Sequence, residues 1–195
     1  MPIDNSTPWG ELSSPPPSLP IFDDERDLSS VLSNLGPTTL RLAEGDFVSL
    51  TGGRHEGVGK KRKYRCDVLE VRGLEPPRWT IGTIELRRRK QRILGGFCIV
   101  TNLGTREGDR YSVRSHPNDG KFELIEALDG LTWRERMTLS RRFARGGDLA
   151  HPLVKQRQEI SYEPRESLHV FVDGVYCGRH RVEIAIHPDF LEIYI

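Results

Sequence analysis

The sequence has few of the features that mark disulfide-stapled, metal-binding or membrane-spanning proteins. Its three cysteines, Cys66, Cys98 and Cys177, include no CxxC pair, which indicates reduced thiols in a cytosolic protein. Cys177 and His180 have a C-x-x-H spacing without a matching second pair, so no metal site is predicted. No apolar run approaches the roughly 20 residues that span a bilayer, and the N-terminus lacks the regions of a signal peptide. We therefore expect a cytoplasmic protein without a transmembrane segment.

The sequence also lacks an excess of charge of either sign. Its 29 basic and 28 acidic residues give a net charge of +1, so the composition as a whole does not indicate nucleic acid or an anionic membrane as a partner. Basic residues do cluster in 60–65 and 87–92, where Tyr64 or Trp79 could stack on bases. Binding of a phosphorylated ligand or nucleic acid through these clusters is the weakest of three alternatives, and nucleic acid is not expected.

Two catalytic signatures are missing. The Gly- and Lys-rich stretch 53–63 fails the phosphate-loop pattern GxxxxGK[ST], because Arg54 and Lys61 stand at the positions of the first Gly and the Ser or Thr. This stretch is therefore interpreted as a basic surface loop. No G-x-S-x-G sequence supports Ser-His-Asp hydrolysis.

The chain reads as a polar tail followed by one β-rich domain. Residues 1–20 are rich in Ser and Pro and predict an extended tail, which leaves 21–195 as the domain. Apolar residues at helical spacing predict a short helix within 23–35, and one or two helical turns follow 43–45. Many short alternating segments follow from Tyr64 onward, and 95–102 is the most apolar and is placed at the centre of a sheet.

One later helix is well marked. Thr132 and Glu135 form a capping box, and Trp133 and Met137 share one face with Ser140 and Ala144. Short strands with one such helix predict a mainly β, α+β fold, an antiparallel β-sandwich with a helical excursion.

The stretch from Arg114 to Leu128 contains the strongest candidate site. Pro117, Asn118, Asp119 and Gly120 form a tight-turn sequence, and an alternating strand pattern follows from Phe122. A carboxylate at the edge of such a turn is held rigidly yet faces solvent, so Asp119 could act as an acid or base. The plainer interpretation is a hairpin connection without a chemical role.

Several stretches resemble, in order, a superfamily that contains diacylglycerol kinases, sphingosine kinases and NAD kinases, with bacterial lipid kinases the most similar. The strand Phe97–Asn102 and the stretch His116–Leu124 resemble its "aNg…GG" and "P-x-A-x-x-[ND]-DG-x-L-[DE]-[VL]" patterns. Ala43–Gly52 is similar to its "GTGND" loop and helix, and Val172-Asp173-Gly174 to its "DGE" hairpin. The resemblance extends from about Leu42 to Ile195 and implies a lipid-kinase C-terminal β-sandwich.

The resemblance implies roles for particular residues. Asp119 would be the general base for a lipid hydroxyl, His116 would tune it or bind phosphate, and Arg114 would neutralise an anionic group. Four further residues would contribute to binding: Asp46, Asn102, Asn118 and Lys121. A turn histidine bonded to backbone, and a helix N-terminal acid that complements the dipole, are the plainer interpretations of His116 and Asp46.

The sequence also departs from that family. No "GGDGT" sequence is present, Gly45 replaces the Asn of "GTGND", and Val175 replaces the Glu of "DGE". We expect a lipid-kinase-like domain without stand-alone kinase activity, which binds a lipid, a nucleotide or a partner protein that supplies the missing domain. The alternative is an active lipid kinase in an assembly. ATP and Mg²⁺ would be cofactors only if a partner supplied a nucleotide-binding domain. A homo-oligomer is a further alternative to a protein partner, and the ligand could also be a phosphorylated small molecule.

Overall fold

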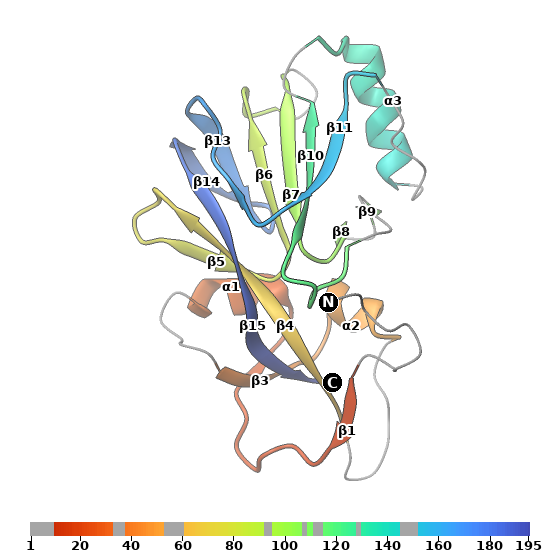
Figure 1. Ribbon diagram of the computed structural model, residues 1–195, viewed down its shortest axis with the longest axis vertical. Coiled ribbons are helices and arrows are strands. Elements are labelled where there is room, and N and C mark those ends of the chain that lie inside the picture. Colours follow the sequence, from red (N-terminus) through yellow and green to blue (C-terminus); the bar gives the residue numbers. More distant parts are fainter. Residues whose placement is uncertain are drawn as a thin grey trace.

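Two β-sheets form the body of the computed structural model, which describes residues 10–32, 38–52, 61–91, 95–106, 109–110, 115–127, 130–144 and 152–195. The first sheet has the strand order β1-β4-β15-β3-β2, with β12 added on β15 and β5 on β4. The second has the order β11-β10-β7-β6-β13-β14. Figure 1 shows the two sheets and helix α3 beside the second sheet.

The bounds of the elements are as follows. The strands of the first sheet are β1 (Glu11–Ser13), β2 (Ile21–Phe22), β3 (Thr38–Leu42), β4 (Lys61–Arg72), β5 (Arg78–Thr80), β12 (Ser161–Tyr162) and β15 (Glu183–Tyr194). Those of the second are β6 (Thr83–Arg87), β7 (Phe97–Thr101), β10 (Phe122–Ala127), β11 (Lys155–Glu159), β13 (Leu168–Val172) and β14 (Val175–His180). The remaining elements are β8 (Thr105–Arg106) paired with β9 (Asp109–Arg110), and the helices α1 (Glu25–Val31), α2 (Asp46–Leu50) and α3 (Trp133–Ala144).

The long antiparallel pair β4–β15 joins two hydrophobic cores. Tyr64, Cys66 and Val68 of β4 pack in a core that includes residues of α1 and α2, whereas Leu69 and Val71 pack in the core between the sheets. Because successive side chains of a strand point to opposite faces, this strand passes from one core to the other. The side chains from Cys66 to Leu69 are all buried, and any polar group within this run needs partners in the protein.

The N-terminal part of the domain is a small parallel unit. β2 and β3 pair in parallel with α1 between them, and β3 also pairs in parallel with β15. Leu28 and Leu32 bury the inner side of α1 against this sheet. The first sheet is therefore mixed, although the fold is mainly β, as the sequence predicts.

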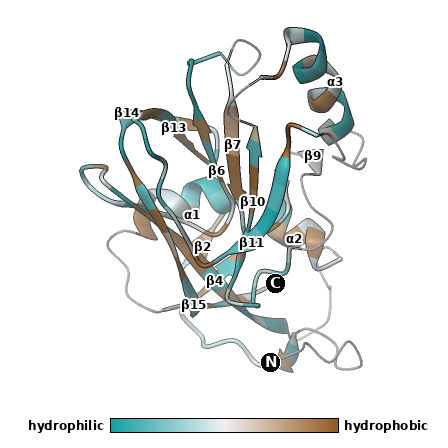
Figure 2. Ribbon diagram, turned by 45° about the horizontal axis from the view of Figure 1, so that its top comes forward, coloured by the Kyte–Doolittle hydropathy of each residue, from teal (hydrophilic) through white to brown (hydrophobic). Residues whose placement is uncertain are grey.

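The second sheet has α3 on its outer face. Ile99 and Ile125 project from β7 and β10 and pack with Leu139 of α3. The predicted capping box is confirmed, because Glu135 accepts from the amide of Thr132 at 2.6 Å and Thr132 Oγ1 accepts from the amide of Glu135 at 3.3 Å. β7 is buried and lies third of six strands, as predicted. Figure 2 shows the apolar β7 and the polar edge strand β11.

Three sequence predictions need correction. Lys61–Lys63, expected in a basic loop, begin β4 and pair with β1, which itself comes from the predicted tail. The sequence His187-Pro188-Asp189 predicts a turn, but these residues form a register shift inside the single strand β15, since β4 continues to pair on both sides of it. Within the described residues β10 pairs only with β7 and β11, so the turn before Phe122 is not a hairpin connection.

Candidate functional site

A buried carboxylate on β4 holds the predicted turn in place. Asp67 Oδ2 accepts from the amide of Gly120 at 2.7 Å, and Oδ1 accepts from the amide of Asp189 at 2.8 Å. The amide of Asp67 in turn donates to the carbonyl of Pro117 at 2.7 Å. Asp67 therefore ties the turn to both long strands of the first sheet.

Asp67 is fully buried, and its environment disfavours its charge. Burial raises the pKa of Asp67 to about 6, and the nearby carboxylates of Asp119 and Asp189 also raise it, against the two amide hydrogen bonds. The sequence reasoning missed this residue. The one indication of it in the sequence is an acid between Cys66 and Val68. This part of the strand is buried on both faces, where a carboxylate needs partners in the protein.

Asp119 lies beside this carboxylate. Its Oδ1 accepts from the amide of Lys121 at 2.9 Å, the local bond of an Asx turn. Burial raises the pKa of Asp119, whereas burial lowers the pKa of His116, so that the neutral imidazole is favoured near pH 7. The pair thus provides a carboxylate and a neutral imidazole, which are groups that can accept a proton.

The other predicted residues divide between two places. Asn102 is buried and donates from Nδ2 to the carbonyl of Asp67 at 2.9 Å, which joins the end of β7 to β4 at the residue that holds the turn. Asn118 and Lys121 lie on the turn and are partly or fully exposed. Arg114 lies outside the described residues.

Asp46 lies apart from this group, in an acidic cavity of about 240 Å³ at the ends of β2 and β3. Four carboxylates and one guanidinium contribute to its lining: Asp24, Glu25, Asp46, Asp173 and Arg26. None of Asp119, His116, Asn102, Asn118 or Lys121 contributes to it. The structure therefore does not bring Asp46 together with the turn.

Glu25 fills the space between α1 and α2. Its Oε1 accepts from the amide of Phe47 at 2.6 Å, and a Cβ on Gly45 would lie 2.1 Å from Oε2. Burial raises the pKa of Glu25, and the Asp46 carboxylate raises it further. Asp24 caps α1 by accepting from the amide of Asp27 at 2.9 Å, so the chain's own acids satisfy amides at the starts of both helices.

Asp173 closes the far side of the cavity from the β13–β14 hairpin. Its Oδ2 accepts from the hydroxyls of Ser29 and Thr80, both at 2.5 Å, and Oδ1 accepts from the amide of Thr83 at 2.8 Å. Asp173 and Gly174 both have positive φ, at 45° and 82°, as a two-residue type I′ hairpin requires. The hairpin that the sequence predicted here is confirmed, and the acid at its tip is committed to internal bonds.

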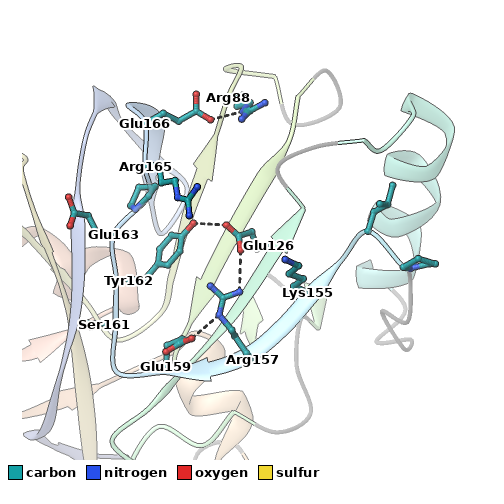
Figure 3. A pocket seen from close by; sticks show the side chains of 13 residues that line it. Arg88, Glu126, Lys155, Arg157, Glu159, Ser161, Tyr162, Glu163, Arg165 and Glu166 are labelled. Carbon is teal, nitrogen blue, oxygen red and sulfur yellow. Dashed lines mark hydrogen bonds and ion pairs between the residues drawn. The ribbon is translucent and has the colours of Figure 1, made fainter.

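A larger groove of about 830 Å³ lies where the chain crosses from β11 to β12 (Figure 3). At its base Glu126 accepts from Tyr162 at 2.9 Å and pairs with Arg157 at 3.2 Å. Arg88 and Glu166 pair at 2.6 Å. Cations and carboxylates neutralise one another along most of this groove, so we expect it to bind a highly charged ligand only weakly.

The basic clusters noted in the sequence are also largely engaged. Arg87 pairs with Glu85 and stacks over Phe171, while Lys90 lies 4.5 Å from the centre of the Tyr176 ring. Lys63 pairs with Glu192 at 3.1 Å. Lys60 and Arg92, which complete the two clusters, lie outside the described residues.

Comparison with known proteins identifies the fold. No family model matches the chain, and no curated protein matches it. Two solved structures of proteins assigned as diacylglycerol kinases from Bacillus anthracis both superimpose with a TM-score of 0.62, at 12% and 11% identity. The alignments cover 87% and 89% of this chain and 73% and 76% of those chains. A third, a diacylglycerol kinase from the same organism, gives a TM-score of 0.55 at 12% identity, over 80% of this chain and 67% of that chain.

The chain has a diacylglycerol-kinase-like fold. At 11–12% identity this likeness establishes the architecture alone. The alignments cover about three quarters of the first two kinase-like chains, so they do not limit the likeness to a C-terminal sandwich. No helix in the described ranges is long and apolar enough to cross a membrane.

ATP and Mg²⁺, which such a fold suggests, do not fit the residues present. Ligands of open α/β sheets bind beyond the carboxyl ends of parallel strands, and β2 and β3 lead there into the acidic cavity. Its lining has three more carboxylates than cations, which would repel a triphosphate. Among the described residues no group of three or more His, Cys, Asp or Glu side chains could hold a metal ion.

Proposed function

We propose that this chain is a lipid-kinase-like protein that binds a ligand, a lipid or a partner protein, and does not transfer a phosphoryl group by itself. Its diacylglycerol-kinase-like fold supports the relation to lipid kinases. The acidic cavity at the ends of β2 and β3 argues against catalysis, because phosphoryl transfer needs donors and cations around the phosphates.

The observation that carries the proposal is the position of Glu25. A backbone amide at the start of a helix after a parallel strand is the usual partner of a phosphate oxygen. Here the amide of Phe47 donates to the Glu25 carboxylate instead, and Glu25 is only 8% exposed. A nucleotide would have to displace a carboxylate of the protein and then lie against three others.

The test is a kinase assay on the chain alone, with diacylglycerol in mixed micelles and ATP-Mg²⁺. We expect no phosphatidic acid above the protein-free control and no thermal shift with ATP-Mg²⁺. A diacylglycerol kinase of known activity serves as the positive control, and it should form phosphatidic acid in the same micelles. ATP-dependent phosphorylation of the lipid would overturn the proposal. A thermal shift with ATP-Mg²⁺ would reject the argument from Glu25.

A second candidate function is an active lipid kinase within an assembly, in which Asp119 is the general base. The elevated pKa of Asp119, caused by burial, favours this role. Both Asp119 and Asp189 lie near Asp67, but only Asp119 lies on the turn that the sequence indicates. If an assembly turns over, Asp119→Ala should abolish the reaction while the fold is retained, and Asp189→Asn, which tolerates the positive φ of 52° at that position, should leave most of it. Unchanged turnover in Asp119→Ala would remove this residue from the mechanism.

A further inference from the structure

The outer face of α3 combines an exposed tryptophan with arginines. Trp133 is 57% exposed, although tryptophan in a helix normally packs inward. The side of α3 that packs on the second sheet carries Leu139, which is 2% exposed. Met137, one turn after Trp133 and only partly buried, lies on the same side of the helix as Trp133.

Arginines flank this apolar pair. Arg134 lies over the Trp133 ring at 5.4 Å, and Arg141 follows it after two helical turns, both with exposed side chains. In all, α3 has four arginines and one glutamate, a net charge of +3 in 12 residues. The single glutamate, Glu135, accepts hydrogen bonds in the capping box.

Another exposed apolar side chain lies near the start of the helix. Leu153, 45% exposed, packs against Gly130, three residues before Trp133. Figure 1 shows α3 at one extremity of the molecule, with no other described helix or strand outside it. Among the described elements, none therefore separates the outer face of α3 from a flat object.

We propose that the outer face of α3, defined by Trp133, Arg134, Met137 and Arg141, docks on an anionic phospholipid surface. Tryptophan favours the membrane–water interface, and a helix with arginines around an apolar stripe lies in that interface. The near-zero net charge of the whole chain does not oppose this, because a surface potential acts within about 10 Å. The inference goes beyond the proposed function and holds whether or not the chain is catalytic.

The apolar stripe favours a membrane over nucleic acid. Phosphate contacts need only cations, whereas Trp133 and Met137 gain free energy by leaving water for the acyl-chain boundary. We therefore expect the chain to bind anionic vesicles more tightly than a DNA duplex, which offers negative charge but no apolar phase.

Co-sedimentation of the full chain with vesicles tests this inference. We expect binding to phosphatidylcholine vesicles that contain phosphatidylglycerol, weaker binding at high salt, and little binding to pure phosphatidylcholine. Each arginine near such a surface contributes about 1 kcal/mol, or about fivefold in partitioning, so Arg134→Gln with Arg141→Gln should reduce binding about 25-fold. Trp133→Ala should reduce it about fivefold.

Two matched controls test whether the position on α3 matters, or only the loss of positive charge or of an aromatic ring. Arg62→Gln with Arg65→Gln removes the same charge from β4, and Tyr176→Ala removes an exposed aromatic ring from β14; neither should change binding. Equal losses in the control and α3 variants, or no binding to anionic vesicles, would overturn the proposal. Binding to a DNA duplex but not to vesicles would also overturn it. Circular dichroism checks that each variant is folded, and Trp133→Phe, which keeps an apolar ring, should retain most of the binding.

Discussion

Asp67 is an ionisable side chain that the fold holds away from water, and this gives stability a definite pH dependence. The folded chain keeps the Asp67 proton up to a pH of about 6, because burial raises its pKa, whereas the unfolded chain loses it near pH 4. Ionisation therefore costs stability. The contribution of the protonated form is complete below about pH 4 and is lost as the pH rises through about 6.

Asp67→Asn should remove this dependence. The free energy of unfolding of the wild type, measured by urea denaturation, should fall relative to that of the variant as the pH rises from about 4 to about 6. The variant itself is less stable, because Gly120 and Asp189 donate to different oxygens of Asp67, and the NH2 group of Asn would face one of these two amides. Glu183→Gln on the exposed side of β15 is the control. Parallel curves for the wild type and Asp67→Asn would show that Asp67 titrates at its ordinary pKa.

The sequence predicted the turn itself, but not the residues that hold the turn in place. The Pro-Asn-Asp-Gly sequence gave the position of Asp119 directly, because turn chemistry is local. Asp67 could not be paired with Gly120 or Asp189 from sequence, since those amides are 53 and 122 positions away. The same holds for Glu25 and Phe47, whose contact depends on how two helices meet in space.

At the scale of elements, one carboxylate ties the tip of the β13–β14 hairpin to its neighbours, in addition to the pairing of β13 with β6. Asp173→Ala would leave the hydroxyl of Thr80 and the amide of Thr83 without their acceptor, whereas the hydroxyl of Ser29 can still donate to the carbonyl of Glu25 at 2.7 Å. A buried donor left unsatisfied costs about 1–3 kcal/mol, so with two such donors the variant should lose at least about 2 kcal/mol of unfolding free energy. The substitution also places Ala at a φ of 45°, a value that L-residues other than Asn and Asp adopt only with strain.

Asp173→Asn relieves both effects. Asn tolerates the positive φ and keeps one oxygen acceptor, so its loss should be clearly smaller than that of Asp173→Ala. Chemical denaturation of both variants measures the difference. Equal losses would assign the effect to the carboxylate charge rather than to the hydrogen bonds that an amide can replace.

Element positions followed from local patterns, but element pairing did not. The helix from Trp133 and the apolar strand β7 match the sequence expectation, since capping and hydrophobicity are encoded within a few residues. The expected turn at His187–Asp189 is wrong because Pro188 and Asp189 are absorbed as an irregularity, with β4 holding the strand on both sides. Pairing across the sheet outweighs a local turn signal there.

For the whole molecule, the sequence indicated a sandwich but not the parallel unit beside it. β15 comes last in the chain yet pairs in parallel with β3 near the beginning. Register between segments so distant is set by burial of side chains on shared strands, which no local window contains. Because β15 pairs with both β3 and β4, it also connects the two hydrophobic cores.

The shared pair β4–β15 predicts that the two cores unfold together. Phe47→Ala affects the core around α1 and α2, and Phe122→Ala affects the core between the sheets. Each should cost about 3–5 kcal/mol, and each should move one common calorimetric transition, because neither core can lose β4 or β15 and persist. Val48→Ala and Val170→Ala make milder versions of the same pair, in case the larger truncations prevent folding. Two calorimetric peaks, of which each substitution moves only its own, would mean that the parallel unit and the sandwich are separate folding units joined by two long strands.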